Sequence, residues 1–136
     1  MKIVKTKSHW DMMTLNAAPI SQGVYMYIAS SGTSDPFIKI SGTRVANMRT
    51  GEQFRLPSAT PVNPFNGKLT LGKGEEKPIG TIPIGDLCAV GEGKNRDIYL
   101  KMAYNQVCCL TCGFEVRDTT YFTMVEHLPN AKLSLQ

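Results

Sequence analysis

The sequence contains no long apolar run. No stretch of the 136 residues approaches the roughly 18 consecutive apolar residues of a membrane-spanning helix, so we expect no transmembrane segment. The first residues, MKIVKTKSHWDMM, begin with lysines, but His9, Trp10 and Asp11 interrupt the apolar stretch that a signal peptide needs. We therefore expect a cytoplasmic protein that makes no membrane contact and keeps its thiols reduced.

The sequence also lacks the patterns that identify most enzymes. It has two histidines, His9 and His127, and neither belongs to an H-E-x-x-H motif. A G-x-S-x-G nucleophile elbow and a G-x-x-x-x-G-K-[ST] phosphate loop are both missing. The paired carboxylates Glu75 and Glu76 lie in a loop-like stretch, whereas general acid–base catalysis needs positioned, partly buried groups. The sequence therefore predicts a protein that is not an enzyme.

Long helices are excluded by twelve glycines and eight prolines, which are scattered along the chain. One short helix is expected over residues 8–17, because Ser8 and Asp11 resemble a capping box and Pro19 closes the segment. The remaining regular structure reads as short strands with turn residues between them, and 119–128 alternatively reads as a short helix. The stretch 63–72 contains Asn66-Gly67, a strong turn signal that leads into a strand over 68–71. The other expected strand regions are 24–30, 37–41, a hairpin over 43–57, 79–90 with Pro83 inside it, 97–104, 106–111 and 119–128.

This pattern predicts a mainly β (β-rich α+β) fold, a small antiparallel barrel or sandwich with one short N-terminal helix. We expect a single domain over residues 1–136, because the length suits one domain and no linker or repeat interrupts it. Residues 130–136 form either a final strand or a loose tail.

Three of the four cysteines lie together in VCCLTCGFEV. The C-x-x-C-G form resembles a zinc knuckle, and a four-ligand site would take Cys88, Cys109, Cys112 and His127; however, a second C-x-x-C is absent. A redox pair is the second interpretation, although the surroundings read as strand and turn rather than as a helix start. The third interpretation is structural: the cysteines act as small apolar side chains on a strand that is buried on both faces.

Two glycine- and lysine-containing loops, LGKGEEKPIG (71–80) and GEGKNRD (91–97), are candidate binding elements. Their glycines let backbone amides approach an anion, and basic side chains nearby can neutralise phosphate. Acidic residues in the same loops partly cancel that charge, so both also read as exposed hairpin tips. The cations in question are Lys73, Lys77, Lys94 and Arg96.

Charge is unevenly distributed along the chain, whose net charge is +4. Residues 1–68 hold eight Lys and Arg against three acids, and residues 69–136 hold seven against eight. The basic half is either a solvated sheet face or a surface for phosphate, and four aromatic residues near its cations resemble a stacking surface for single-stranded nucleic acid. This basic stripe consists of Lys39, Arg44, Arg49 and Arg55.

These observations favour a non-enzymatic binding protein without a cofactor. We expect a homo-oligomer that presents loops to a macromolecular partner, such as a virion component or a phage-encoded inhibitor of a host protein. The first alternative is a binder of a phosphate-bearing ligand, either a nucleotide or single-stranded nucleic acid, through the Gly-Lys loops or the basic stripe. The second is a zinc-stabilised β domain.

Overall fold

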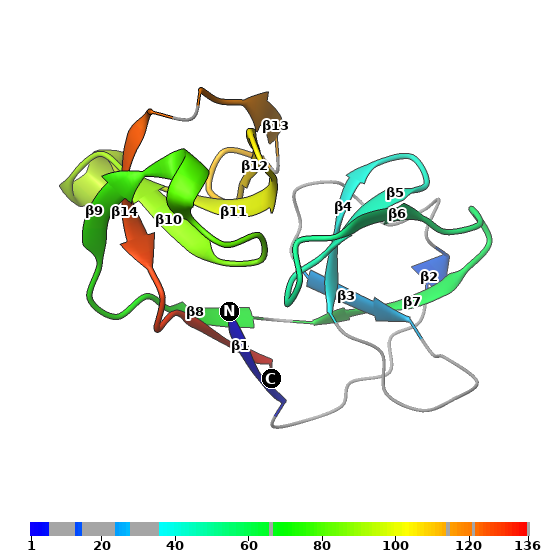
Figure 1. Ribbon diagram of the computed structural model, residues 1–136. Helices are drawn as coiled ribbons and strands as arrows, with labels where there is room; N and C mark the ends of the chain where they lie inside the picture. Colours follow the sequence, from blue (N-terminus) through cyan, green and yellow to red (C-terminus); the bar gives the residue numbers. More distant parts are fainter. Residues whose placement is uncertain are drawn as a thin grey trace.

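A computed structural model describes residues 1–5, 13–14, 24–27, 36–65, 67–113, 115–120 and 122–135. Within these ranges the chain forms three β-sheets, and its helical segments are two short 3-10 turns, η1 (Ile79–Thr81) and η2 (Gly93–Asn95) (Figure 1). The strands are β1 (Lys2–Lys5), β2 (Met13–Thr14), β3 (Val24–Tyr27), β4 (Phe37–Ser41), β5 (Arg44–Asn47), β6 (Gln53–Arg55), β7 (Pro61–Phe65), β8 (Gly67–Thr70), β9 (Glu75–Pro78), β10 (Leu87–Val90), β11 (Asp97–Ala103), β12 (Gln106–Cys109), β13 (Glu115–Asp118), β14 (Met124–Leu128) and β15 (Lys132–Leu135).

The sheet that contains the cysteines has six antiparallel strands in the order β13-β12-β11-β10-β14-β9. Its strand β11 is buried from Ile98 to Met102, because alternate side chains enter two different apolar clusters. Leu100 and Cys108 belong to the larger cluster, and Cys109 belongs to the cluster on the other face. The expected two-sided burial of the cysteine strand is therefore confirmed.

The other six-stranded sheet has the order β2-β7-β3-β4-β5-β6 and contains the expected hairpin. Strands β5 and β6 pair antiparallel, and Gly51 donates its amide to Asn47 O at 2.8 Å to close the turn. Gly51 has φ +74°, and a Cβ atom there would overlap the carbonyl oxygen of Lys101 in β11. Glycine thus lets the hairpin turn pack directly against the backbone of the neighbouring sheet.

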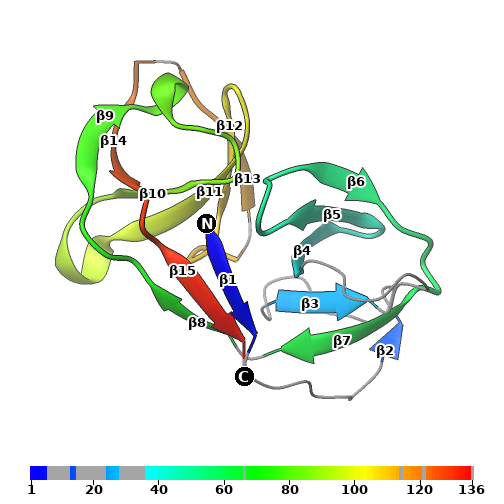
Figure 2. The ribbon, with the colours of Figure 1, turned by 60° about the horizontal axis from the view of Figure 1, so that its bottom comes forward.

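The third sheet, β1-β15-β8, joins distant parts of the chain. Strand β1 pairs with β15 in parallel, with Lys2 opposite Lys132, and β15 pairs with β8 antiparallel (Figure 2). The largest apolar cluster contains Ile38 of β4, Leu100 of β11 and Leu133 of β15, one from each of the three sheets. Burial of these side chains in one core holds the sheets together.

The mainly β, antiparallel fold is confirmed, with two differences. The described strands leave open sheet edges, so they do not close into a barrel. The helix expected over 8–17 falls outside the described residues except for Met13–Thr14, which pair as β2 with β7.

Four other segments differ from an expectation or decide between two. The strand expected over 79–90 was too long: η1 follows β9, and β10 begins only at Leu87, after Gly85 with φ +97°. Strand β7 ends at Phe65 and β8 begins at Gly67, and the two strands belong to different sheets, so they do not form a hairpin at this turn signal. Residues 124–128 are a strand rather than a helix, and Lys132–Leu135 form a strand rather than a loose tail.

Candidate functional site

The two Gly-Lys loops meet at one pocket of about 480 Å³. The first loop leads into β9, and the second forms the tip of the β10–β11 hairpin, where Val90 pairs with Asp97. Strand β14 lies between β9 and β10 and completes the wall. We call this hollow the acidic pocket; its lining residues are Gly74, Glu76, Ala89, Val90, Gly91, Glu92, Met124, Val125 and Glu126.

The acidic pocket combines carboxylates with exposed apolar side chains. Glu76 and Glu126 are register partners on β9 and β14, and Glu92 lies in the hairpin loop. Val90 is 43% exposed and Met124 is 51% exposed, although both are large hydrophobic residues. The lining contains no lysine or arginine among the described residues, so the pocket presents negative charge beside apolar surface.

The cations of the two loops lie at different distances from carboxylates. Arg96 Nη2 donates to Glu126 Oε1 at 2.9 Å, so this guanidinium forms an ion pair with a carboxylate of the acidic pocket. Lys77 Nζ lies 3.8 Å from Glu75 Oε2 in a half-exposed ion pair. Lys73 is exposed, and Lys94 lies in η2. The structure therefore brings the loops together, but two of their four predicted phosphate ligands face carboxylates.

The basic stripe is divided between two faces of its sheet. Arg44 is the register partner of Arg55, whereas Lys39 is the partner of Val45, the next residue along β5. Because neighbouring residues on a strand point to opposite faces, Lys39 lies on the other side from Arg44. Lys39 is also 6% exposed, and Arg49 lies in the exposed turn. The four cations thus do not form one continuous surface.

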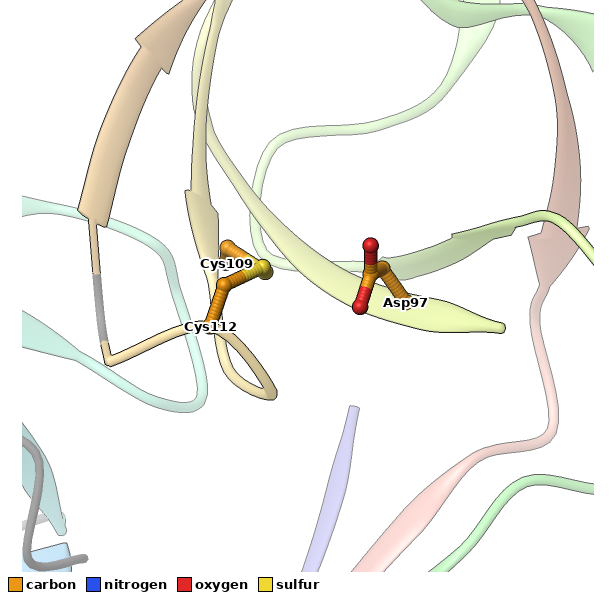
Figure 3. A group of neighbouring side chains, drawn as sticks. All are labelled: Asp97, Cys109 and Cys112. Carbon is orange, nitrogen blue, oxygen red and sulfur yellow. A yellow bond between two sulfur atoms is a disulfide. The ribbon is translucent and has the colours of Figure 1, made fainter. Parts of the chain in front are cut away.

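Cys109 and Cys112 form a disulfide at the end of β12, with their Cα atoms 5.3 Å apart (Figure 3). Gly113 follows with φ +78°, a conformation that favours glycine and turns the chain toward β13. The carboxylate of Asp97, at the start of β11, lies with the two sulfurs in a group whose ligand atoms are all within 4.8 Å of one another. The sequence singled out this cysteine pair, but the expectation that its thiols are reduced was wrong, and the sequence did not indicate Asp97 as their neighbour.

Asp97 is held in place by hydrogen bonds. Thr111 Oγ1 donates to Asp97 Oδ1 at 3.0 Å and accepts from the amide of Ile98 at 3.1 Å. The same hydroxyl lies 3.6 Å from Cys109 Sγ. The threonine between the two cysteines therefore links the carboxylate to the sulfur pair.

Cys88 and His127, the other two predicted zinc ligands, lie elsewhere in the sheet. They are register partners on β10 and β14, whereas Cys109 lies on β12 beyond Tyr99 of β11. Strands separated by one other strand are about 10 Å apart, so Cys88 and Cys109 are poorly placed to share one ion. His127 Nε2 instead pairs with Asp86 Oδ2 at 2.8 Å.

Two further thiols and an amine are buried near these elements. Burial raises the pKa of the Cys88 thiol and of the Cys108 thiol to about 12 each, so neither supplies a ready thiolate. Lys101 is 2% exposed and donates from Nζ to Ile79 O at 2.6 Å. Its burial lowers its pKa, while the Cys88 thiolate would raise it. The hydrogen bonds of Lys101 to Ile79, Gly85 and Asp86 hold the 79–86 segment against β11.

In comparisons with known proteins, no family model, curated protein or solved structure matches the chain. Among the described residues, no helix is long and apolar enough to cross a membrane.

Proposed function

We propose that the protein is a non-enzymatic binding module that takes a basic and apolar segment of a partner protein into the acidic pocket. The observation that carries this proposal is the lining: three glutamates, Glu76, Glu92 and Glu126, beside the exposed side chains of Val90 and Met124. Exposed apolar residues next to polar ones are typical of protein-interaction surfaces.

The pocket chemistry defines the partner. A lysine or arginine of the partner would face the glutamates, and an adjacent apolar side chain would cover Val90 and Met124. Glu126 already pairs with Arg96, so in the described part of the chain Glu76 and Glu92 are the pocket carboxylates that we assign to a partner cation. Burial of the apolar rim would provide affinity, and the charge pairs would provide orientation and a faster association.

A free sheet edge next to the pocket supports the same function. In the described part of the chain, β9 is hydrogen-bonded to β14 alone, so its other side can accept an extended segment. Strand β13 is the opposite edge of the sheet and can serve a second copy of the chain in the same way. Self-association through an edge would give the homo-oligomer that the sequence suggested.

The anion-binding alternative has weaker support. It needs Lys73, Lys77, Lys94 and Arg96 to act together, and the carboxylates that line the pocket would repel a phosphate group. The test below gives this alternative its own outcome.

The test measures binding of short acetylated peptides by isothermal titration calorimetry in 50 mM salt and in 200 mM salt. One peptide carries Arg-Leu repeats, and its matched control carries Glu-Leu repeats. We expect the basic peptide alone to bind, and we expect the double variant Glu76→Lys/Glu92→Lys to weaken it by about tenfold or more, a change of about 1.4 kcal/mol. Glu52→Lys, an exposed charge reversal in the β5–β6 turn, is the control and should leave binding unchanged.

Two results would contradict the proposal. Equal binding of the basic peptide to the wild type and to the double variant would place the binding site elsewhere. Binding of the acidic peptide, or of inorganic phosphate in competition with it, would favour the anion-binding alternative. Native mass spectrometry of the same samples measures subunit number independently of the peptide.

A further inference from the structure

The cysteine pair has a neighbour that a purely structural disulfide does not need. Asp97 has one carboxylate oxygen fixed by Thr111, and a carboxylate oxygen of Asp97 lies within 4.8 Å of both sulfurs. Among the residues that the structure describes, Asp97, Cys109 and Cys112 are the one group of three potential metal ligands with such close donor atoms. A disulfide gains nothing from this carboxylate, whereas a cation bound by two thiolates would.

We propose that the reduced Cys109–Cys112 pair, together with Asp97, binds a single thiophilic divalent cation of the Zn²⁺ class, and that disulfide formation releases it. Two thiolate sulfurs and one carboxylate oxygen are ligands that Zn²⁺ takes at about 2.3 Å and about 2.0–2.2 Å, respectively. The fourth tetrahedral position would go to water. This set differs from the four-ligand site that the sequence suggested, because Asp97 replaces Cys88 and His127.

Three local features favour this site. The C-x-x-C-G turn is present, and Gly113 adopts the left-handed conformation that turns the chain sharply after the second cysteine. Thr111 orients Asp97 as the partners of metal ligands commonly do. Cys112 and Asp97 are half-buried rather than enclosed, so an ion can reach them.

The release step is a thiol–disulfide exchange with a small-molecule disulfide such as oxidised glutathione. A Cys thiolate attacks one sulfur of that disulfide and expels one glutathione thiolate; the second Cys then attacks the mixed disulfide and expels the other. The protein loses two electrons, the small disulfide gains them, and the S–S bond of the protein replaces both metal–sulfur bonds. The cation leaves because Asp97 alone cannot hold it.

The test uses Co²⁺ as a spectroscopic probe, because thiolate ligands give it a charge-transfer band in the near ultraviolet. The full chain is reduced, freed of reductant and titrated with Co²⁺ and then with competing Zn²⁺. We expect a one-to-one complex with this band in the reduced wild type, no band after oxidation with glutathione disulfide, and recovery of the band on reduction. Cys112→Ser should abolish the band; it is preferred over Cys109→Ser because Cys109 is fully buried.

Two matched pairs of variants separate loss of a metal ligand from loss of folding: Asp97→Asn with Glu115→Gln, and Cys112→Ser with Cys88→Ala. Asp97→Asn should weaken Co²⁺ binding by about tenfold or more, whereas Glu115→Gln, an exposed carboxylate paired with Arg117, should not. Cys88→Ala should leave the band intact, because this buried thiol is outside the cluster. Thermal melts of the metal-free proteins check that each variant is folded.

Several results would overturn the proposal. These are no charge-transfer band in the reduced wild type, a band that survives Cys112→Ser, an affinity unchanged by Asp97→Asn, or equal binding by oxidised protein. None of these readouts involves the acidic pocket, so this proposal and the proposed function can fail separately.

Discussion

The two buried thiols predict a steep loss of stability in alkali. Cys88 and Cys108 are both 0% exposed and lie in different apolar clusters on opposite faces of the same sheet. Burial raises each pKa from 9.0 to about 12. The folded protein therefore keeps both protons at a pH at which the unfolded chain has released them, so the free energy of unfolding falls as the pH rises from 9 toward 12.

The size of the effect follows from these pKa values. At pH 10 deprotonation of the thiols stabilises the unfolded state by about 1.4 kcal/mol for each thiol, or roughly 3 kcal/mol for both. At pH 11 this stabilisation is about 2.7 kcal/mol for each thiol. Small domains are stable by about 5–15 kcal/mol in total, so the two thiols alone can bring the protein close to unfolding near pH 11. Lys101 acts in the opposite direction, because a lowered amine pKa adds stability as the pH rises toward 10.5.

The assay compares variants at matched pH, because Lys101 is common to all of them. Urea unfolding of the wild type, Cys88→Ala, Cys108→Ala and the double variant is measured from pH 8 to pH 10.5, with mass spectrometry to verify that the Cys109–Cys112 disulfide has not exchanged. Each alanine should lower the free energy of unfolding by a pH-independent amount, because packing is lost. Each single variant should also remove about half of the difference between the wild type and the double variant in the slope of unfolding free energy against pH. A double variant with the same slope as the wild type would refute the reasoning.

Three further predictions concern the core and the junction between the sheets. Gly51→Ala should destabilise the protein by roughly 2 kcal/mol or more, because the new Cβ overlaps the Lys101 carbonyl and φ is positive. Gly42→Ala, which has open space around the new Cβ, should destabilise it by about 1 kcal/mol, and thermal melts compare the two variants. Lys101→Met should lower the free energy of unfolding in urea by about 1–3 kcal/mol at pH 7, because the buried Ile79 carbonyl loses its donor; an unchanged value would mean that the relieved burial of the amine offsets that loss. Leu100→Ala should cost about 2–5 kcal/mol by the same assay, since Leu100 is 0% exposed in the largest cluster, and a cost below 1 kcal/mol would contradict its central position.

Local patterns predicted the strands that pair with a near neighbour in sequence. The hairpin over 43–57 and the pair 97–104 and 106–111 were recognisable because alternating apolar residues flank short turns. Sequence predicted the strand at β8 but not its partner, since β15 lies some sixty residues away and nothing local encodes that pairing. It also extended β10 back through 79–86, because Ile79 and Ile82 are apolar like strand residues; they instead cover the face of the sheet.

At the candidate sites too, the sequence predicted local motifs but not the residues that strand pairing brings beside them. The cysteine pair and both Gly-Lys loops were visible as motifs, but their neighbours depend on strand register. Asp97 could have been found by counting back along the hairpin from the turn at Tyr104 and Asn105, because that places it opposite Thr111 or Cys112. The one-residue irregularity between Lys101 and Ala103 decides between these two positions, and it has no clear signal in the sequence. The acidic pocket needs β14 between β9 and β10, an order that no local pattern gives.

The parallel pairing of β1 with β15 also has a consequence for biosynthesis. Lys2 can pair with Lys132 only after the chain has been synthesised as far as β15, and β8 needs the same strand as its partner. Until then β1 and β8 expose unpaired backbone groups, while the hairpins of the six-stranded sheets can already form from local contacts. The nascent chain therefore passes through a period in which two strand edges are open to association with other chains, and completion of β15 ends that period.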